Sequence, residues 1–437
     1  MAVPTTDPIL VIGGGAFGIS TVFHLLNAGY SDITVLDKDE EIPSRFSAAN
    51  DLNKIVRAEY EDPFYTDLTL KAIEAWKTPL FAPHFHQVGF LHCVSGKAPV
   101  EALDTLNRFR ASAERHPKIK KKVVPLDGAD TIRDLVWQYQ ESSLSGWHGY
   151  LNTLDGYAHS GNAVKGLYDV VRKRGVKFIL GKDGAVAEIV YEKTAQGKKT
   201  KGVKTASGHF LPAGLIIVAA GAAASRLIPE IGSQLVAKSW SVAHVHLTDD
   251  ETSALRGIPV TYARDLGFFF EPDPKTNLLK LCPMGGGYIN TDPKTGVSHA
   301  PGTIEESAFL PKADEAQLRK LLSQTLPHLA DRPLVKKSLC WFADTKDSDF
   351  IVDYVPGTDS SVVMLSGDSG HGFKMFPIVG DWVKNLLTAT DGKQPVARWR
   401  WKTPAKADEG NWGAGVSWRL GASLELADIK PTRDSKL

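Results

Sequence analysis

Cysteine is scarce in this chain, which has three cysteines in 437 residues. Cys93, Cys282 and Cys340 lie far apart in the sequence, and no two of them have the spacing of a metal site. The sequence therefore predicts neither a disulfide framework nor a zinc site, and it favours a reducing compartment.

An excess of charge of either sign is also absent. The chain has 51 Lys and Arg residues against 50 Asp and Glu residues, so its formal net charge is +1. This balance does not favour a nucleic-acid partner. The basic run at residues 118–122 is more typical of a solvated surface than of a binding patch.

Long apolar runs are lacking as well. No stretch reaches the length of about 20 residues that a membrane helix needs, and we expect no membrane partner. The apolar residues near the N-terminus are interpreted as a strand rather than a secretory signal. At 437 residues, with 43% hydrophobic and 23% charged residues, the chain is predicted to be a soluble protein of two domains.

The most informative stretch is the N-terminal one, residues 9–37. An apolar run is followed by Gly13, Gly15 and Gly18 in the spacing G-x-G-x-x-G, then by a helix-like segment and a β-branched run that ends at Asp37. This order of strand, turn, helix and strand is typical of a dinucleotide-binding unit. In such a unit Gly13 forms the turn, Gly15 lets a pyrophosphate approach the backbone, and Gly18 lets the helix pack closely on the strand. Asp37 stands where a carboxylate can bind a ribose.

Two further stretches resemble parts of a nucleotide site. In residues 213–225 a β-branched run ends at Ala220 and Gly221, which is typical of a strand ending against a cofactor and also of an ordinary core strand before a turn. The glycine-rich loop at residues 367–374 offers amides to an anionic flavin or a phosphate. The first motif suits NAD as well as FAD, but these stretches supply the additional contacts that the longer FAD needs.

The remaining pattern predicts an α/β protein with a discontinuous nucleotide domain. Helices are expected at residues 63–76, 102–115, 161–174 (with Ser160 as its cap), 312–326 and 377–387. Strands are expected at 176–180, 186–191 and 202–206, and antiparallel strands at 239–247 and 267–282. We assign residues 1–80, 150–235 and 335–400 to an FAD-binding Rossmann domain, 81–149 and 236–334 to an interleaved α+β substrate domain on an antiparallel sheet, and 401–437 to a tail.

The chain ends in Ser435, Lys436 and Leu437. A terminal Ser-Lys-Leu is an address that the peroxisomal import receptor reads. A chance match of three residues is the alternative. We therefore expect the import receptor as a partner and the peroxisome as the location.

The late motifs carry a family resemblance that covers nearly the whole chain. Residues 340–353 (CWFADTKDSDFIVD), followed by SGDSGHGFK, resemble the covalent-flavin stretch and closing loop of the monomeric sarcosine oxidase family. The SAANDLNK, VAAGA and GFFFEP segments and Trp399-Arg400-Trp401 resemble its fructosyl amino acid oxidase (amadoriase) branch. The resemblance implies a glutathione-reductase-like fold and a monomeric oxidase with FAD joined to Cys340 by a thioether. From its residue type alone, Cys340 would be interpreted as a buried, inert thiol.

The resemblance also implies roles for individual residues. Lys54 matches a lysine beside the flavin that assists its reaction with oxygen. Arg57 and Lys374 match a pair that binds the substrate carboxylate, Glu271 matches a carboxylate that contacts the sugar, and Arg400 matches a gating arginine. The expected cofactor-binding residues are Gly13, Gly15, Ala16, Phe17, Gly18, Asp37, Lys38, Ser47, Asn50, Lys54, Val186, Ala220, Gly221, Cys340, Asp368, Gly370, His371, Gly372, Phe373 and Lys374.

One departure from the family pattern concerns the substrate. Where amadoriases usually continue with an acidic Cys-Asp-Glu stretch, this chain has Cys282-Pro283-Met284-Gly285-Gly286-Gly287-Tyr288. The expected function is an FAD-dependent oxidase that acts with oxygen on the C–N bond of a secondary amine in an N-substituted amino acid, with a fructosyl amino acid as the leading substrate. Oxidation of saccharopine, pipecolate or sarcosine is the alternative within the family. An NAD-dependent dehydrogenase and a flavin-binding protein without turnover are the alternatives from other classes.

Overall fold

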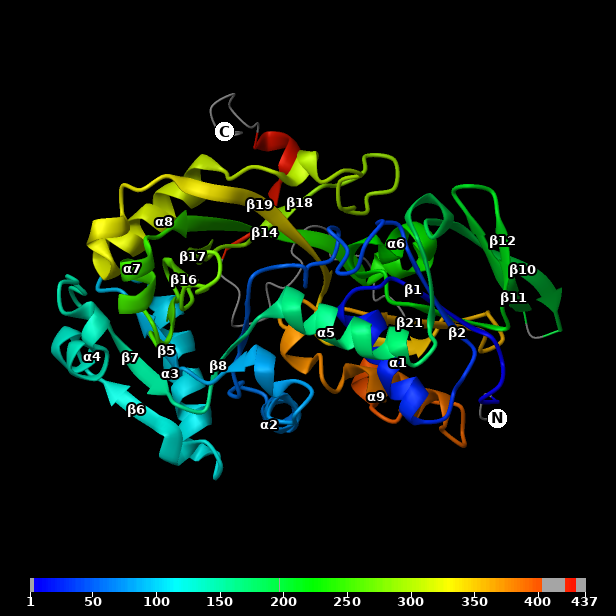
Figure 1. Cartoon of the computed structure of the whole chain (residues 1–437), viewed down its shortest axis with the longest axis horizontal. Coiled ribbons are helices and arrows are strands. Elements are labelled where there is room, and N and C mark those ends of the chain that lie inside the picture. The colour runs from blue at the N-terminus through cyan, green and yellow to red at the C-terminus, as the bar shows by residue number, and fades with distance from the viewer. Residues whose placement is uncertain (1–3, 196, 403–420, 430–437) are drawn as a thin grey trace.

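The computed structural model describes residues 4–195, 197–402 and 421–429. Over these residues the chain forms two lobes, and the long strands β14 (Leu235–His246) and β19 (Leu334–Thr345) run side by side from one lobe towards the other (Figure 1). Each lobe is built around one sheet. None of the helices in this described part of the chain is long and apolar enough to span a membrane.

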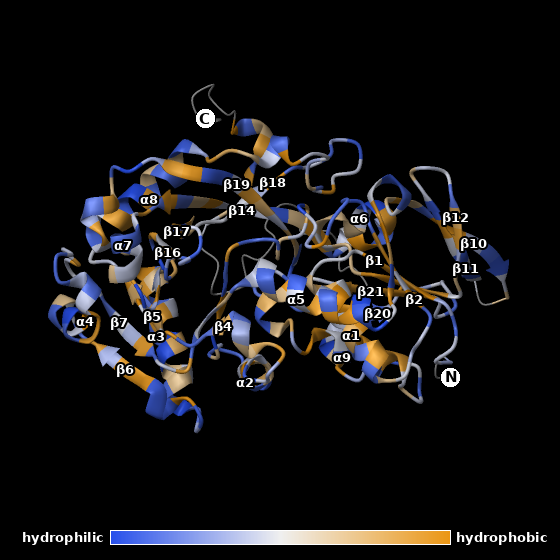
Figure 2. Ribbon diagram, in the orientation of Figure 1, coloured by the Kyte–Doolittle hydropathy of each residue, from blue (hydrophilic) through white to orange (hydrophobic). Residues whose placement is uncertain are grey.

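The first lobe contains a six-stranded sheet over the described residues. Its strand order is β20 (Ile351–Tyr354), β21 (Val362–Ser366), β13 (Leu215–Val218), β1 (Ile9–Ile12), β2 (Ile33–Asp37) and β9 (Lys177–Leu180). All neighbours are parallel except β20 and β21. The central strands β1 and β13 are buried at every position, which is why they are continuous apolar runs (Figure 2) rather than alternating ones.

The two faces of this sheet are covered differently. Val11 and Val35 on one face pack with Val22 of α1 (Ala16–Asn27) and Leu386 of α9 (Val379–Leu387), and α5 (Ser160–Lys173) lies against α1. The other face packs on the antiparallel strands β10 (Val186–Thr194), β11 (Gly197–Thr205) and β12 (Phe210–Pro212) and on α6 (Ala224–Leu227). The predicted Rossmann-type α/β fold is confirmed.

The second lobe contains a larger, mostly antiparallel sheet. Its order is β22 (Leu424–Glu425), β18 (Tyr288–Ile289), β14, β17 (Leu278–Pro283), β16 (Gly267–Phe269), β15 (Val260–Ala263), β5 (Phe90–Val94), β7 (His148–Asn152) and β6 (Val123–Leu126), and β19 pairs with β14. The pairs β15–β5 and β18–β22 are parallel. The helices of this lobe, over the described residues, are α3 (Val100–Arg115), α4 (Ala129–Leu135), α7 (Asp249–Ala254) and α8 (Lys312–Thr325) (Figure 1).

A small three-stranded sheet carries the predicted site residue Lys54. It consists of β3 (Lys54–Val56), β8 (Gly156–Ala158) and β4 (Phe85–His86). Shortly after β3, helix α2 (Pro63–Trp76) begins behind Asp62, whose carboxylate accepts a hydrogen bond from the amide of Phe64 at 2.9 Å. The short connection holds residues 57–60 between a strand and a capped helix.

Two expectations differ from the structure. Ser160 is the first residue of α5 rather than its cap; the preceding residue is His159, and the Ser160 hydroxyl donates to the carbonyl of Asp51 at 2.8 Å. The predicted boundaries at residues 150 and 335 fall within or at the edge of strands of the second sheet, because β7 pairs with β5 and β19 pairs with β14. A sequence pattern shows that a strand exists but not which sheet it joins.

Candidate active site

A large cavity with a volume of about 1080 Å³ is lined by residues of both sheets. The turn after β1, the end of β2 and the loop after β13 line one part of it. The strands β14, β17 and β19 and the loop at 366–374 line another. Of the predicted cofactor residues, all except Gly18 line this cavity.

Gly18 lies where the sequence analysis expects it, although it does not line the cavity. A Cβ atom at this position would lie 1.9 Å from the carbonyl oxygen of Gly13. Helix α1 and the end of β1 therefore approach each other too closely for any side chain at position 18. This agrees with the predicted role of Gly18 in helix packing.

The N-terminus of α1 suits an anionic group. Gly15 occupies the position before the helix, its first turn has no acidic residue, and among the described residues no side chain caps it. Amides that lack a partner at a helix N-terminus are donors for a phosphate. At the end of β2, Asp37 is buried and accepts hydrogen bonds from the amides of Gly14 (2.8 Å) and Asp39 (2.9 Å), and burial raises its pKa. These groups, together with the volume of the cavity, fit the predicted FAD.

A charged cluster adjoins Cys340 in the cavity. Asp51 accepts from Lys54 Nζ at 2.7 Å and from Lys280 Nζ at 2.5 Å, and Lys54 Nζ lies 3.6 Å from Cys340 Sγ. Burial opposes the charged form of Asp51, but the two ammonium groups outweigh it and hold the pKa of Asp51 well below its ordinary value. Burial would lower the pKa of Lys54, but Asp51 reverses this effect and holds it above its ordinary value. The cluster therefore keeps a net positive charge beside Cys340.

A second group of cations lies around Tyr60. The Arg57 guanidinium lies 4.6 Å and Lys374 Nζ lies 5.3 Å from the centre of the Tyr60 ring. Lys374 Nζ donates to the Tyr60 hydroxyl at 2.9 Å, and this hydroxyl lies 2.9 Å from Nδ1 of His371. Both cations line the cavity, and such a pair suits a carboxylate.

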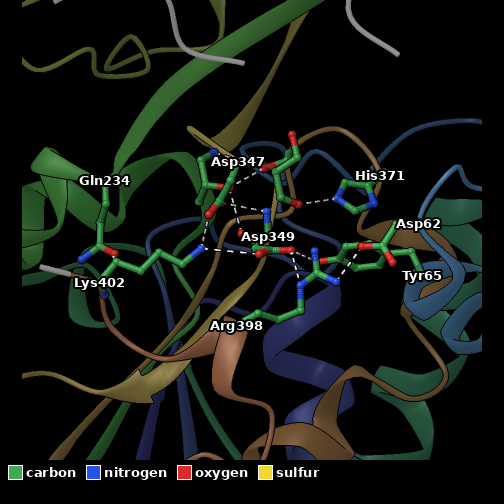
Figure 3. A network of polar contacts seen from close by, with 11 residues as sticks. Asp62, Tyr65, Gln234, Asp347, Asp349, His371, Arg398 and Lys402 are labelled. Atoms are coloured by element: carbon green, nitrogen blue, oxygen red, sulfur yellow. Dashed lines mark hydrogen bonds and ion pairs between the residues drawn. The ribbon is translucent and has the colours of Figure 1, made fainter. Parts of the chain in front are cut away.

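A polar network outside the cavity supports His371. Its Nε2 lies 2.9 Å from the carbonyl oxygen of Ser348, in the turn between Asp347 and Asp349. Arg398 and Lys402, from the C-terminal segment, form ion pairs with these two aspartates, as Figure 3 shows. Arg398 also pairs with Asp62, and the Tyr65 hydroxyl donates to Asp349 at 2.6 Å. We call these residues, without His371, the C-terminal ion-pair network.

Two predicted residues do not reach the cavity. Glu271 accepts from the Tyr157 hydroxyl at 2.8 Å and from the Gly257 amide at 2.7 Å, and it is not part of the cavity lining. Arg400 donates from Nε to the carbonyl of Gln394 at 2.8 Å and also lies outside the lining. In this structure both side chains are bonded to neighbouring groups, and the sugar contact of Glu271 and the gating role of Arg400 stay predictions.

The cavity lining also contains residues that the sequence analysis missed. Lys280 and Asp51 complete the charged cluster, and Trp240, Tyr262 and other aromatic residues line the wall on the second lobe. The cationic lining residues are Lys38, Arg45, Lys54, Arg57, Arg226, Lys280, Lys336, Lys337 and Lys374, and the acidic ones are Asp37, Asp51 and Asp368. The cavity is therefore built for anions. The sequence contained a signal for Lys280, because it is the one lysine within a strand, β17, that is otherwise apolar.

Comparisons with known proteins agree with this geometry. The family model described as FAD dependent oxidoreductase matches residues 8–386. The L-saccharopine oxidase of Schizosaccharomyces pombe is 33% identical, and the match covers 98% of this chain and 99% of that protein. The crystal structure of the deglycating enzyme fructosamine oxidase (Amadoriase II) from Aspergillus fumigatus superposes with a TM-score of 0.87 at 30% identity, with all of both chains covered. Fructosyl peptide oxidase from E. terrenum gives a TM-score of 0.87 at 29% identity, again over all of both chains.

Proposed function

The chain belongs to the FAD-dependent oxidoreductase family and is an oxidase of amine (CH–NH) donors, and we propose that it oxidises the secondary amine of an N-substituted amino acid. The observation that carries this proposal is the pair Arg57 and Lys374, two basic side chains that line the cavity around Tyr60. A carboxylate bound there would hold the neighbouring amine at a fixed distance inside the cavity.

The flavin would be held by residues of both lobes. The amides at the start of α1 would bind its pyrophosphate and Asp37 its ribose, and the loop at 368–374 would contact its ring end. When bound, FAD supplies the acceptor for two electrons from the CH–NH group, which leaves an imine that water hydrolyses, and oxygen takes up these electrons as hydrogen peroxide. The cluster of Lys54, Asp51 and Lys280 contributes a fixed positive charge that stabilises negative charge as it develops on oxygen.

We also propose that Cys340 carries the flavin covalently. Its sulfur lines the cavity beside Lys54 and is partly exposed, whereas Cys282 is buried and burial raises its pKa to about 11. Acid precipitation tests this proposal. Yellow colour should stay with the protein pellet of the wild type and of Cys282→Ser, which also lines the cavity, and should be released from Cys340→Ser. Colour that stays with the Cys340→Ser pellet would place the linkage elsewhere.

The charge of the cavity indicates which substrate class fits it best. Glu271 lies outside the lining, the residues at 282–285 that line it include no carboxylate, and Lys336 adds positive charge, whereas Lys337 pairs with Glu315. A fructosyl group is neutral, whereas saccharopine, a secondary amine that joins lysine to glutarate, has three carboxylates. We therefore place saccharopine first, as the similarity to L-saccharopine oxidase also suggests, and a fructosyl amino acid second, as the similarity to fructosamine oxidase suggests.

A peroxide-coupled assay of paired substrates tests the function. Saccharopine, fructosyl-lysine, fructosyl-valine, pipecolate and sarcosine are compared at equal concentrations, and dimethylamine serves as the control that lacks the carboxylate of sarcosine. We expect the highest kcat/KM with saccharopine and no turnover of dimethylamine. A preference for fructosyl substrates would reverse our order, and no peroxide with any of these amines would refute the function.

The C-terminal tripeptide Ser435-Lys436-Leu437 lies outside the described residues, and we propose that it directs the protein to the peroxisome. A fluorescent protein fused in front of the full chain should collect in peroxisomes, and deletion of the three residues should disperse it. Dispersed fluorescence from the full chain would refute the address.

A further inference from the structure

Lys374 lies in an unusual electrostatic position. Its side chain is 4% exposed, and the Arg57 guanidinium lies against the same Tyr60 ring. Among the residues that the structure describes, no ion pair joins either cation to a carboxylate. Two neighbouring cations that no carboxylate pairs with directly cost free energy, and the lysine can relieve this cost by losing its proton, whereas an arginine cannot.

The hydrogen bonds around Tyr60 fix the orientation of Lys374. Because a carbonyl only accepts, His371 Nε2 carries the hydrogen and donates to Ser348, so Nδ1 of the neutral ring accepts from the Tyr60 hydroxyl. The oxygen of that hydroxyl then accepts from Lys374 Nζ at 2.9 Å. Nζ also donates to the His371 carbonyl at 3.1 Å. A neutral amine uses both hydrogens in these two bonds and keeps its lone pair for the cavity that Lys374 lines.

The charged groups around Lys374 favour its neutral form. Burial has the largest effect and the Arg57 charge the second largest, and together they hold the pKa of Lys374 well below its ordinary value. Asp155 and Glu59 act in the opposite direction. Burial and the Glu59 charge, however, raise the pKa of Asp155 well above its ordinary value, which weakens the opposing effect of this carboxyl on Lys374.

We propose that Lys374 is the base of the reaction: it is neutral before substrate binds and accepts the proton of the substrate's ammonium group once the carboxylate is bound. In this step one N–H bond on the substrate breaks and one forms on Nζ, and no electrons are gained or lost. The product is a neutral amine, whose free lone pair is the form that can be oxidised, beside an ammonium that pairs with the carboxylate. This inference rests on the proposed amine oxidase function and identifies what activates the amine.

The order of events follows from the charges. Before binding, Arg57 and burial oppose a charge on Lys374; afterwards, the substrate carboxylate neutralises Arg57 and attracts a proton to Nζ. Carboxylate binding and amine deprotonation are therefore coupled. A zwitterionic amino acid supplies both the carboxylate charge and the proton that Lys374 accepts. When a carboxylate without an amine binds, Lys374 must take its proton from water.

Proton uptake tests the proposal independently of turnover. Propionate, which has no amine, is bound to the purified holoenzyme in weakly buffered solution with a pH indicator, and binding is followed by flavin absorbance. Between about pH 7 and 9 we expect uptake of about one proton per site in the wild type and in the surface control Lys71→Arg. In Lys374→Arg, whose guanidinium stays charged, propionate should bind with almost no uptake.

A second readout concerns the pH dependence of anaerobic flavin reduction. In Lys374→Arg and Lys374→Met the amine must arrive deprotonated, so reduction should become faster by about tenfold per pH unit below the pKa of the substrate amine. The wild type should show a much weaker dependence. Wild-type binding of propionate without proton uptake, or uptake in Lys374→Arg equal to that of the wild type, overturns the proposal. Absence of peroxide with every amine would refute the proposed function instead.

Discussion

At the scale of single residues, the cavity uses carboxylates to set the charge of its lysines. The Asp51 carboxylate forms ion pairs with both Lys54 and Lys280. Lys280 lies 229 positions after Asp51 in the sequence. Lys54 could be identified through a motif. Lys280 could not be identified as a partner of Asp51, because nothing in the local pattern of either segment specifies a contact over such a separation. Tyr60 was missed for the same reason, since its bonds to Lys374 and His371 cross more than 300 positions.

The role of Asp51 predicts a pH effect on the reaction with oxygen. In the wild type Asp51 holds the pKa of Lys54 high, so its charge persists through the alkaline range. In Asp51→Asn burial lowers that pKa unopposed by this carboxylate, and reoxidation of the reduced enzyme should slow by about tenfold per pH unit above the new value. Stopped-flow reoxidation between about pH 6 and 10 measures this. Asp381→Asn, which removes an ion pair with Lys384 on α9, is the control, and equal profiles for both variants would contradict the role of Asp51.

Asp368 predicts a pH effect on stability with the opposite sign. Burial raises its pKa to about 7, and its side chain accepts from the Ala343 amide at 3.0 Å. Because the folded pKa is raised, the cost of ionising Asp368 grows as pH rises from about 4 to about 7 and is constant above. In the apoprotein Asp368→Asn should therefore gain stability over the wild type across this range, by up to about 4 kcal/mol. Urea unfolding at several pH values tests this, and a difference that does not change with pH would contradict it.

At the scale of elements, sequence patterns predicted the helices and strands whose formation depends on nearby residues. The unit of β1, α1 and β2 forms as expected, because buried parallel strands are continuous apolar runs and the close helix crossing demands glycine. The helices α2, α3, α8 and α9 were predicted from their apolar periodicity. The placement of β19 was not, because its residues suit either sheet and only pairing with β14 decides.

The contact between α1 and β1 gives a prediction about Gly18. In Gly18→Ala the new methyl group meets the Gly13 carbonyl, which is backbone and cannot move aside without shifting the turn. We expect a loss of about 1–3 kcal/mol in unfolding free energy and weaker FAD retention before covalent attachment. Gly214→Ala is the matched control, because nothing lies within 4 Å of its new Cβ. Equal stability of the two variants would show that the turn adapts.

At the scale of the whole molecule, residues 398–402 of the C-terminal segment pack against the polar network that supports His371. Residues 398–402 lie against the start of α2 and the turn at 347–349, which are far from each other in sequence (Figure 3). Through the Ser348 carbonyl, this turn orients His371, which faces Tyr60 and thereby Lys374. Residues 398–402, none of which lines the cavity, are thus connected through this turn to the proposed carboxylate site.

Arg398 is the residue that tests this connection. Its guanidinium pairs with Asp62 at 2.6 Å and with Asp349 at 2.9 Å, and it is 35% exposed. Because Asp349 is only 8% exposed at its side chain, Arg398→Gln leaves a buried carboxylate with fewer partners, and we expect a loss of about 1–3 kcal/mol, reduced by the partial exposure of the arginine.

The functional effect separates positioning from general stability. If the turn orients Lys374, Arg398→Gln should raise KM for carboxylate substrates several-fold more than it lowers kcat, and Arg398→Lys should restore part of the loss. Arg110→Gln removes an exposed ion pair with Glu114 on α3 and should change neither quantity. If Arg398→Gln is less stable but has an unchanged KM, the orientation of His371 does not depend on the C-terminal ion-pair network. The network would then contribute to stability alone.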